Sequence, residues 1–201
     1  MGFSSVEIET RFSLPIFSDL YEVIERLDGQ LVREVEGRDF YWGWKRSRVT
    51  GVWKRIRDHN VSENGTVVPY QVSQVKSRMR SPQNPHGIEC WVESEPIPVD
   101  ASKELEALNN RGYSPLIVEI SRRSYRVPFG RGSVDVNSDK SLSPLGFYME
   151  VGVDVDRRSL ISQNVELVGE FIYQKVLPVL RHMRIDAQTA PTYQEILSNG
   201  R

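Results

Sequence analysis

The chain has 201 residues, of which 39% are hydrophobic and 26% charged, and its formal net charge is -1. This is an ordinary globular composition, which excludes a disordered or fibrous chain. The single cysteine, Cys90, excludes an intramolecular disulfide and a structural zinc site built from several cysteines. No apolar run is long enough to cross a bilayer, and the acidic N-terminal stretch is unlike a signal peptide. We therefore expect a soluble, intracellular protein, cytoplasmic, nuclear or viral, and not a secreted one.

The first predicted element is a strand over residues 6–12, where apolar and charged residues alternate strictly. Glu7, Glu9 and Arg11 share one face of this strand. Residues 18–27 then carry apolar side chains at helical spacing, which predicts a short amphipathic helix.

Several short runs rich in valine, isoleucine and aromatic residues follow, each bounded by Gly, Asn, Ser or Pro. These predicted strands are 39–42, 51–57, 67–80, 87–95, 116–127, 132–136 and 146–155. Helices are expected over 101–111 and 160–180, the second either ending at Pro178 or continuing past a kink. The predicted fold is α+β, a closed antiparallel barrel of about eight strands with flanking helices. We expect one domain over 1–187 and a C-terminal tail over 188–201.

The predicted strands have a second face that is charged rather than merely polar. A half-exposed sheet can carry such a face toward solvent without any function. In a closed barrel, however, one face of every strand points inward, where charges are tolerated when they are paired or bound to ions. A set of both signs favours an anionic, metal-bound ligand such as a polyphosphate with Mg²⁺ or Mn²⁺. The charged positions are Arg55 and Arg57, then Lys76 and Arg78, then Glu89, Glu93 and Glu95, then Arg122, Arg123, Asp135 and Glu150.

Other hydrolytic chemistries find less support. The three histidines, His59, His86 and His182, are scattered, and we expect them on the surface. No Gly-rich loop precedes a helix, which argues against a P-loop nucleotidase. Any phosphate must therefore be held by side chains.

The run Glu7-Ile8-Glu9-Thr10-Arg11 resembles the Glu-x-Glu-x-Lys/Arg signature of the triphosphate tunnel metalloenzymes. That superfamily includes the CYTH enzymes and the metal-dependent RNA 5′-triphosphatases of fungal and viral mRNA capping. Later segments resemble the family's basic, lysine, aspartate and closing strands in the family's order. These segments are 53–57, Lys76, 122–125, 134–136 and 145–150.

The resemblance implies a role for each matching residue. Glu7, Glu9 and Glu150 would be the metal ligands and catalytic carboxylates. Asp135 or a glutamate of the 89–95 strand, with Glu95 as the candidate, would help to orient water or hold a second metal. Which of the two adjacent arginines at 122 and 123 points inward is a question of strand register that stays open. The implied triphosphate-binding residues are Arg11, Arg55, Arg57, Lys76, Arg78, Arg122 and Arg123.

One position departs from the family pattern. Where the last strand of the family carries a second glutamate, this chain has Gly152. The metal site therefore loses a ligand unless Asp154 or Glu95 takes its place.

The resemblance implies a divalent-metal-dependent triphosphatase that cleaves the β–γ phosphoanhydride. We expect the substrates to be the 5′-triphosphate end of RNA, as in the first step of mRNA capping, and NTPs, with a guanylyltransferase as a possible partner. The alternatives are a CYTH-type inorganic tripolyphosphatase or thiamine triphosphatase, and a tunnel domain that binds polyphosphate or protein without turnover. The oligomeric state stays open.

Contact with the body of an RNA would need basic and aromatic side chains at the tunnel mouth. The candidates are Trp42, Trp44, Lys45, Arg46 and Arg48, which could equally form an exposed hairpin tip.

Overall fold

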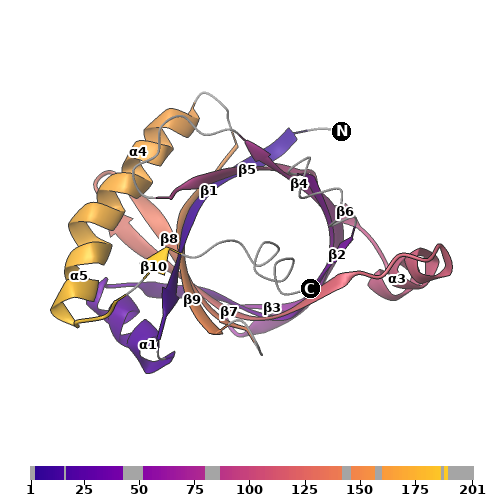
Figure 1. Ribbon diagram of the computed structural model, residues 1–201, viewed down its shortest axis with the longest axis horizontal. Helices are drawn as coiled ribbons and strands as arrows, with labels where there is room; N and C mark the ends of the chain where they lie inside the picture. The colour runs from indigo at the N-terminus through magenta and orange to yellow at the C-terminus, as the bar shows by residue number, and fades with distance from the viewer. Residues whose placement is uncertain are drawn as a thin grey trace.

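Eight antiparallel strands close into a barrel (Figure 1). The structure is a computed structural model, which describes residues 3–15, 17–42, 52–79, 87–141, 146–156, 160–186 and 188–189. Around the ring the order is β1-β5-β4-β3-β2-β7-β8-β9, and β9 pairs back with β1. The predicted closed antiparallel barrel is therefore confirmed. The strands are β1 (Phe3–Leu14), β2 (Gln30–Trp42), β3 (Val52–Glu63), β4 (Thr66–Met79), β5 (Glu89–Ser94), β7 (Leu116–Phe129), β8 (Gly132–Ser141) and β9 (Gly146–Val155).

Two short strands lie outside the ring. β6 (Ile97–Pro98) pairs with β4, and β10 (Gln188–Thr189) pairs with β1 beside Phe12 and Ser13. Apart from these two residues of β10, the segment expected to be a C-terminal tail lies outside the described residues.

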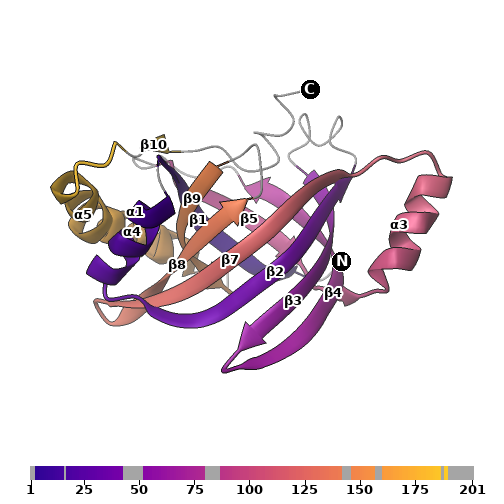
Figure 2. The same ribbon diagram turned by 90° about the horizontal axis from the view of Figure 1, so that it is seen from below.

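The helices lie on two sides of the barrel (Figures 1 and 2). α1 (Phe17–Arg26), α4 (Ile161–Phe171) and α5 (Leu177–His182) gather on one side, and α3 (Ala101–Asn110) stands on the other. None of the helices in the described part of the chain has the length and hydrophobicity needed to cross a membrane.

The long C-terminal helix continues past its proline, as one of the two alternatives predicted. A π-helical turn, Ile172–Val176, joins α4 to α5, and the Leu177 N–H donates to the Ile172 carbonyl, five residues back. Pro178 has no N–H and its ring crowds the preceding turn, so a widened turn at this point accommodates it.

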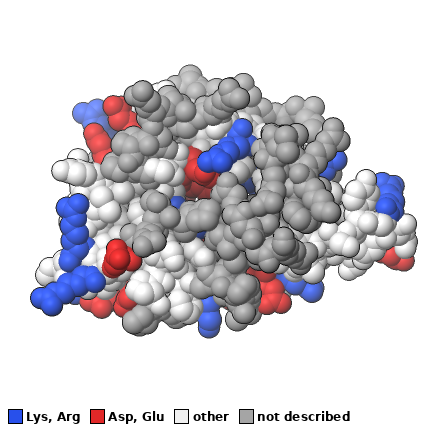
Figure 3. All heavy atoms as spheres, in the orientation of Figure 1, with Lys and Arg blue, Asp and Glu red and all other residues white. Residues whose placement is uncertain are grey.

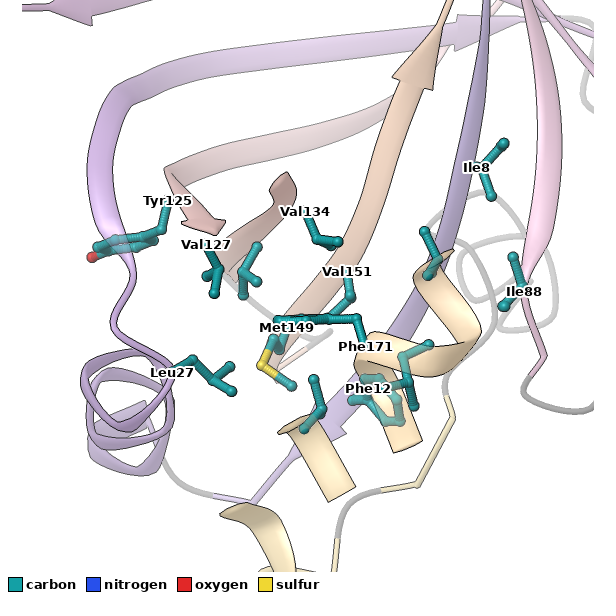
Figure 4. Packing of buried hydrophobic residues seen from close by; sticks show 14 of the residues in the cluster. Ile8, Phe12, Leu27, Ile88, Tyr125, Val127, Val134, Met149, Val151 and Phe171 are labelled. Atoms are coloured by element: carbon teal, nitrogen blue, oxygen red, sulfur yellow. The ribbon is translucent and has the colours of Figure 1, made fainter. Parts of the chain in front are cut away.

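The main hydrophobic core lies outside the barrel wall, under the helices, and Figure 4 shows its packing. Ile8 and Phe12 of β1 are buried there together with Val134 of β8, Met149 of β9 and Phe171 of α4. Because side chains alternate along a strand, the outward apolar residues leave the charged residues between them to face the barrel interior.

β2 and β3 are longer than predicted. Residues 30–38 were missed because their charged side chains give almost no hydrophobic periodicity, yet they pair with β7 from Gln30 onward and with β3 from Glu34 onward. β3 runs on to a tight turn at Asn64 and Gly65, whose φ angles of 51° and 77° are those of a type I′ hairpin. This hairpin extends beyond one end of the barrel (Figure 2).

Candidate functional site

The barrel encloses a charged interior. A cavity of about 440 Å³ opens at one end and continues into a smaller space of about 80 Å³ deeper inside. Figure 3 looks down the barrel from the end opposite this opening, where acidic and basic side chains also lie next to one another near the centre of the face. The residues that line both spaces are Glu7, Glu9, Arg33, Arg57, Arg122 and Glu150.

Three carboxylates meet in this interior. Glu7, Glu9 and Glu150 each offer an oxygen, and these atoms lie within 4.8 Å of one another. The pairing of β1 with β9 brings these residues together. Glu150 is in register with Arg11, and it therefore lies diagonally across the strand pair from Glu9. The side chains of Glu9 and Glu150 are almost fully buried, with residue exposures of 4% and 2%.

The carboxylates of the trio repel one another and lie in a buried environment. Burial raises the pKa of Glu9, and the negative charges of Glu150 and Glu7 raise it further, against the opposing effect of Lys76 and Arg11. Among the described residues, Oε2 of Glu9 has no hydrogen-bond partner. A buried, unpartnered carboxylate oxygen next to two further carboxylates fits a hard divalent cation, which prefers oxygen ligands.

Lys76 lies next to the trio. Its ammonium group contacts the carboxylate of Glu7, and Nζ lies 3.4 Å from Oε1 of Glu9. Burial alone would lower the pKa of Lys76, but Glu7, Glu9 and Glu93 hold it above its usual value. The side chain therefore stays positively charged and partly neutralises the acidic cluster.

Glu150 is held in its ionised form from several sides. Nδ2 of Asn137 donates to its Oε1 at 2.9 Å, and Nη1 of Arg122 lies 3.1 Å from the same oxygen. Arg11 donates to Oε2. Burial would raise the pKa of Glu150, but Arg122, Arg11 and Lys76 hold it well below its usual range.

The register of β7 separates its two adjacent arginines. Arg122 points inward, where Nε and Nη2 donate to both carboxylate oxygens of Asp139 at 2.6 and 2.7 Å. Arg123 points outward with a side chain that is 47% exposed, forming an ion pair with Glu34 and donating to the Tyr21 hydroxyl. Of these two candidates for phosphate binding, only Arg122 reaches the cavity.

A second charged cluster lies deeper in the barrel, around Arg55. Its Nη2 donates to Oε1 of Glu93 at 2.8 Å and to Oε1 of Gln74 at 3.1 Å. Burial would raise the pKa of Glu93, but Arg55, Arg57 and Lys76 lower it to about 2. Glu93 is therefore the member of its strand that joins the interior network.

Asp39 and His59 belong to the same cluster, and His59 corrects the expectation of a surface histidine. His59 is only 7% exposed, and its Nε2 lies 2.8 Å from Oδ1 of Asp39. The other oxygen of Asp39 accepts a hydrogen bond from the Tyr41 hydroxyl at 2.9 Å. Burial would raise the pKa of Asp39, but Arg55, the adjacent His59 and Arg57 hold it far below its usual range.

Besides Arg123, two predicted site residues are not brought to the cavity. Arg78 is half-exposed near the edge of the barrel, where it contacts Glu89 and lies over the ring of Trp91. Glu95 is exposed and follows the last residue of β5, because the strand ends at Ser94 before it can carry Glu95 inward.

Asp135 does line the cavity, at its rim, where Oδ1 accepts a hydrogen bond from Nε of Arg126 at 3.1 Å.

Gly152 lies opposite Glu9 in the pairing of β1 with β9, and the space beside it is too small for a side chain. A Cβ atom at this position would lie 2.4 Å from the Ile8 carbonyl oxygen and 3.2 Å from Cβ of Glu9. A second glutamate cannot be placed here without moving β1. Asp154, two residues on and in register with Glu7, faces the cavity instead. Desolvation of its carboxyl group against the barrel wall, together with the negative charges of Glu7 and Glu93, raises the pKa of Asp154 to about 7.

Sequence reasoning missed several interior residues, of which Asp39, Asn137 and Asp139 contact the predicted ones. Arg33 and Arg126 also line the cavity. The alternation of residues 33, 35, 37, 39 and 41 could have revealed the inward face of β2. The residues proposed to contact RNA at 44–48, and His86, lie outside the described residues.

Comparisons with solved structures place this barrel among known folds. The PH1819 protein from Pyrococcus horikoshii OT3 is 19% identical, with a TM-score of 0.61 over 97% of this chain and 99% of that one. The putative adenylyl cyclase HpAC1 from Hippeastrum, described as having a dominant triphosphatase activity, is 13% identical, with a TM-score of 0.56 over 97% of this chain and 96% of that one. A chain of the Schizosaccharomyces pombe Mediator head module is 11% identical, with a TM-score of 0.51 over 84% of this chain and 94% of that one.

These identities are low enough that the likeness establishes the fold alone. Neither the protein-family models nor the curated proteins give a match to the sequence. The closed eight-strand barrel is the triphosphate tunnel fold, as the order of the motifs predicted.

Proposed function

We propose that this protein is a divalent-metal-dependent phosphohydrolase that cleaves the β–γ phosphoanhydride of a triphosphate. One observation carries the proposal: the buried trio Glu7, Glu9 and Glu150 adjoins a cavity whose walls also carry arginine and lysine. Carboxylates for a hard cation and guanidinium groups for phosphate oxygens are the two parts that phosphoryl transfer needs. The triphosphatase activity described for the Hippeastrum protein supports the same chemistry.

Glu7, Glu9 and Glu150 would hold the cation, Mg²⁺ or Mn²⁺. When bound, such an ion supplies positive charge against the phosphate oxygens and a more acidic water molecule. Arg11, which contacts Glu150, would sit beside the bound phosphate, and Lys76 would move its contacts from Glu7 and Glu9 toward the substrate.

The reaction is an in-line displacement. A water oxygen bonds to the terminal phosphorus, the bridging P–O bond breaks, and its electrons stay on the diphosphate product. Arg55, Arg57 and Arg122 would stabilise the charge on the phosphoryl oxygens, and their positions are fixed in advance by carboxylate partners. Asp135 and Asp154 are the cavity-lining carboxylates that could orient the water and accept its proton.

For the substrate, we propose the 5′-triphosphate end of RNA together with nucleoside triphosphates. Hydrolysis of the RNA end would leave a diphosphate, the acceptor that a guanylyltransferase requires in capping. Inorganic tripolyphosphate and thiamine triphosphate present the same terminal anhydride and form the alternative, CYTH-type, reading.

The test is a substrate panel with the purified full chain. Triphosphate-ended RNA, ATP, thiamine triphosphate and inorganic tripolyphosphate are each incubated with Mg²⁺ or Mn²⁺, and with EDTA, while orthophosphate release is measured. We expect release that depends on the metal and is lost in Glu150→Gln, with Glu119→Gln on the outer face of β7 as the control. Absence of phosphate release from all four substrates would sink the hydrolase proposal.

A binding module without turnover is the second candidate, because the same fold occurs in the Mediator head module. It predicts that the panel compounds bind, or that none does, while no phosphate is released. Phosphate release therefore separates this reading from hydrolysis, and equilibrium binding of the same four compounds distinguishes a module that binds polyphosphate from one that binds protein.

A further inference from the structure

Six buried hydrophobic residues fill the barrel interior at the end away from the wide cavity. They come from five strands, β2, β3, β5, β7 and β9, and each is between 2% and 5% exposed. Tyr41 follows the inward-facing Asp39 by two residues, and Tyr148 precedes Glu150 by two, so both point into the barrel. We call this cluster the aromatic plug. It consists of Tyr41, Trp53, Trp91, Leu116, Val118 and Tyr148.

The aromatic plug contains a ring–ring contact, and two of its polar groups are hydrogen-bonded to carboxylates. The rings of Tyr41 and Trp53 meet edge to face, with centroids 6.3 Å apart and an angle of 88°. The Tyr41 hydroxyl donates to Asp39, and Nε1 of Trp91 donates to Oε2 of Glu89 at 3.2 Å. Side chains from strands on different sides of the ring thus block the interior at this level.

The same strands lead to an open mouth at their other ends. β3 runs from Trp53 in the aromatic plug to Glu63 at the mouth, β7 from Leu116 to Arg126, and β9 from Tyr148 to Asp154. Glu63, Arg126 and Asp154 are exposed and line the wide cavity. Within the described residues, the cavity therefore has one mouth and one floor.

The deepest charges lie directly against the floor. The small inner space is lined by Tyr41 of the aromatic plug together with six basic side chains and four carboxylates, the basic ones being Arg11, Arg33, Arg55, Arg57, Lys76 and Arg122 and the acidic ones Glu7, Glu9, Asp39 and Glu150. A terminal phosphate carries more negative charge than an internal one, so this excess of positive charge, with carboxylates beside it for a cation, suits the free end of a phosphate chain. A nucleoside or other cap at that end would have to displace buried aromatic rings.

We propose that the barrel is a blind pocket that accepts a phosphate chain by one free end and excludes chains capped at both ends. The inference rests on the proposed function and narrows its substrate class. The body of the substrate stays outside the mouth, and each turnover breaks the P–O bond next to the free end and releases one orthophosphate.

A matched pair of compounds tests this geometry. Adenosine 5′-tetraphosphate has one free phosphate end, whereas P1,P4-diadenosine tetraphosphate has the same phosphate chain with both ends capped. We expect the first to yield ATP and orthophosphate, and the second to be cleaved at least about 100-fold more slowly. Cleavage of both at comparable rates would overturn the blind pocket while leaving the hydrolase proposal intact.

Binding gives the same test without turnover. We expect the singly capped compound to displace bound tripolyphosphate at least about tenfold more effectively than the doubly capped one, in the presence of Mn²⁺. Equal displacement would refute the blind pocket even if no compound is hydrolysed. Failure of hydrolysis with a strong preference for the free end would instead support the pocket and refute the enzyme.

Variants of the aromatic plug link the preference to these residues. The measured quantity is the affinity for the doubly capped compound divided by the affinity for the singly capped one. Trp53→Ala should raise this ratio at least about fivefold, and Trp53→Phe should leave it unchanged. The ratio does not depend on the fraction of active protein. Leu116→Ala, a smaller deletion at the same level, serves if Trp53→Ala does not fold, and an unchanged ratio in the folded variant would argue against the plug.

Discussion

Replacing Glu9 by glutamine should make the metal-free protein more stable while removing its response to metal. The oxygens of Glu7, Glu9 and Glu150 lie within 4.8 Å of one another, so with an effective dielectric constant of about 20 each pair of charges repels by roughly 3 kcal/mol. On the same basis, the attraction of Glu9 to Lys76, 3.4 Å away, is about 5 kcal/mol.

The two repulsions that involve Glu9 thus exceed this attraction, and Arg11 offsets part of the difference. We expect Glu9→Gln to gain on the order of 1 kcal/mol, which raises Tm by roughly 2–4 °C in a chain of this size. The sign agrees with linkage: because the pKa of Glu9 is raised in the folded state, its contribution to stability is lost as pH rises above the unfolded value.

Thermal unfolding with EDTA and with Mn²⁺ measures both effects. Mn²⁺ should raise the Tm of the native protein, and it should raise the Tm of Glu9→Gln much less. Glu119→Gln, on the outer face of β7, should match the native protein in both conditions. A lower Tm for Glu9→Gln in EDTA would show that the ion pair with Lys76 outweighs the repulsion and that the trio is structural.

The other predictions concern the two adjacent arginines of β7, the close contact of β1 with β9, and the loss of stability at acidic pH. Arg122→Ala should lower kcat/KM for the best substrate of the panel about 100-fold, because Arg122 faces the cavity, and Arg123→Ala should change it less than about twofold. Gly152→Ala should lose about 2–3 kcal/mol in urea unfolding, since its Cβ would overlap the Ile8 carbonyl, whereas Gly132→Ala, with open space around it, should stay within about 1 kcal/mol. Glu93→Gln should lose about 3 kcal/mol at pH 7. The pKa of Glu93 is lowered to about 2, so its stabilisation is complete above the unfolded value and disappears as pH falls toward 2, where variant and native urea curves should converge.

The sequence predicted the barrel because most strands have a clean apolar face. Ile8 on β1, Val134 on β8 and Met149 on β9 each belong to a series of apolar residues at every second position of their strand. This period of two identifies a strand whether or not the opposite face is charged. The carboxylate trio followed from the order of the motifs, since Glu7 and Glu9 open the first strand of the ring and Glu150 lies in the last.

Long-range register could not be predicted in the same way. Arg122 and Arg123 have the same chemistry, and only the pairing of β7 with β8 decides which one meets Asp139. His59 looked like a surface residue because nothing local shows that β3 continues past Arg57. Its buried partner, Asp39, lies on β2, and only the register of β2 with β3 brings the two side chains together.

The closing pair of strands also governs when the site can exist during synthesis. β1 leaves the ribosome well before its partner β9, which begins only at Gly146, so the two strands cannot pair until the whole segment between them has been synthesised. Contacts of such large sequence separation make folding slow. Glu150 arrives on the same strand that seals the barrel, and the nascent chain therefore cannot assemble its three carboxylates before its wall is complete.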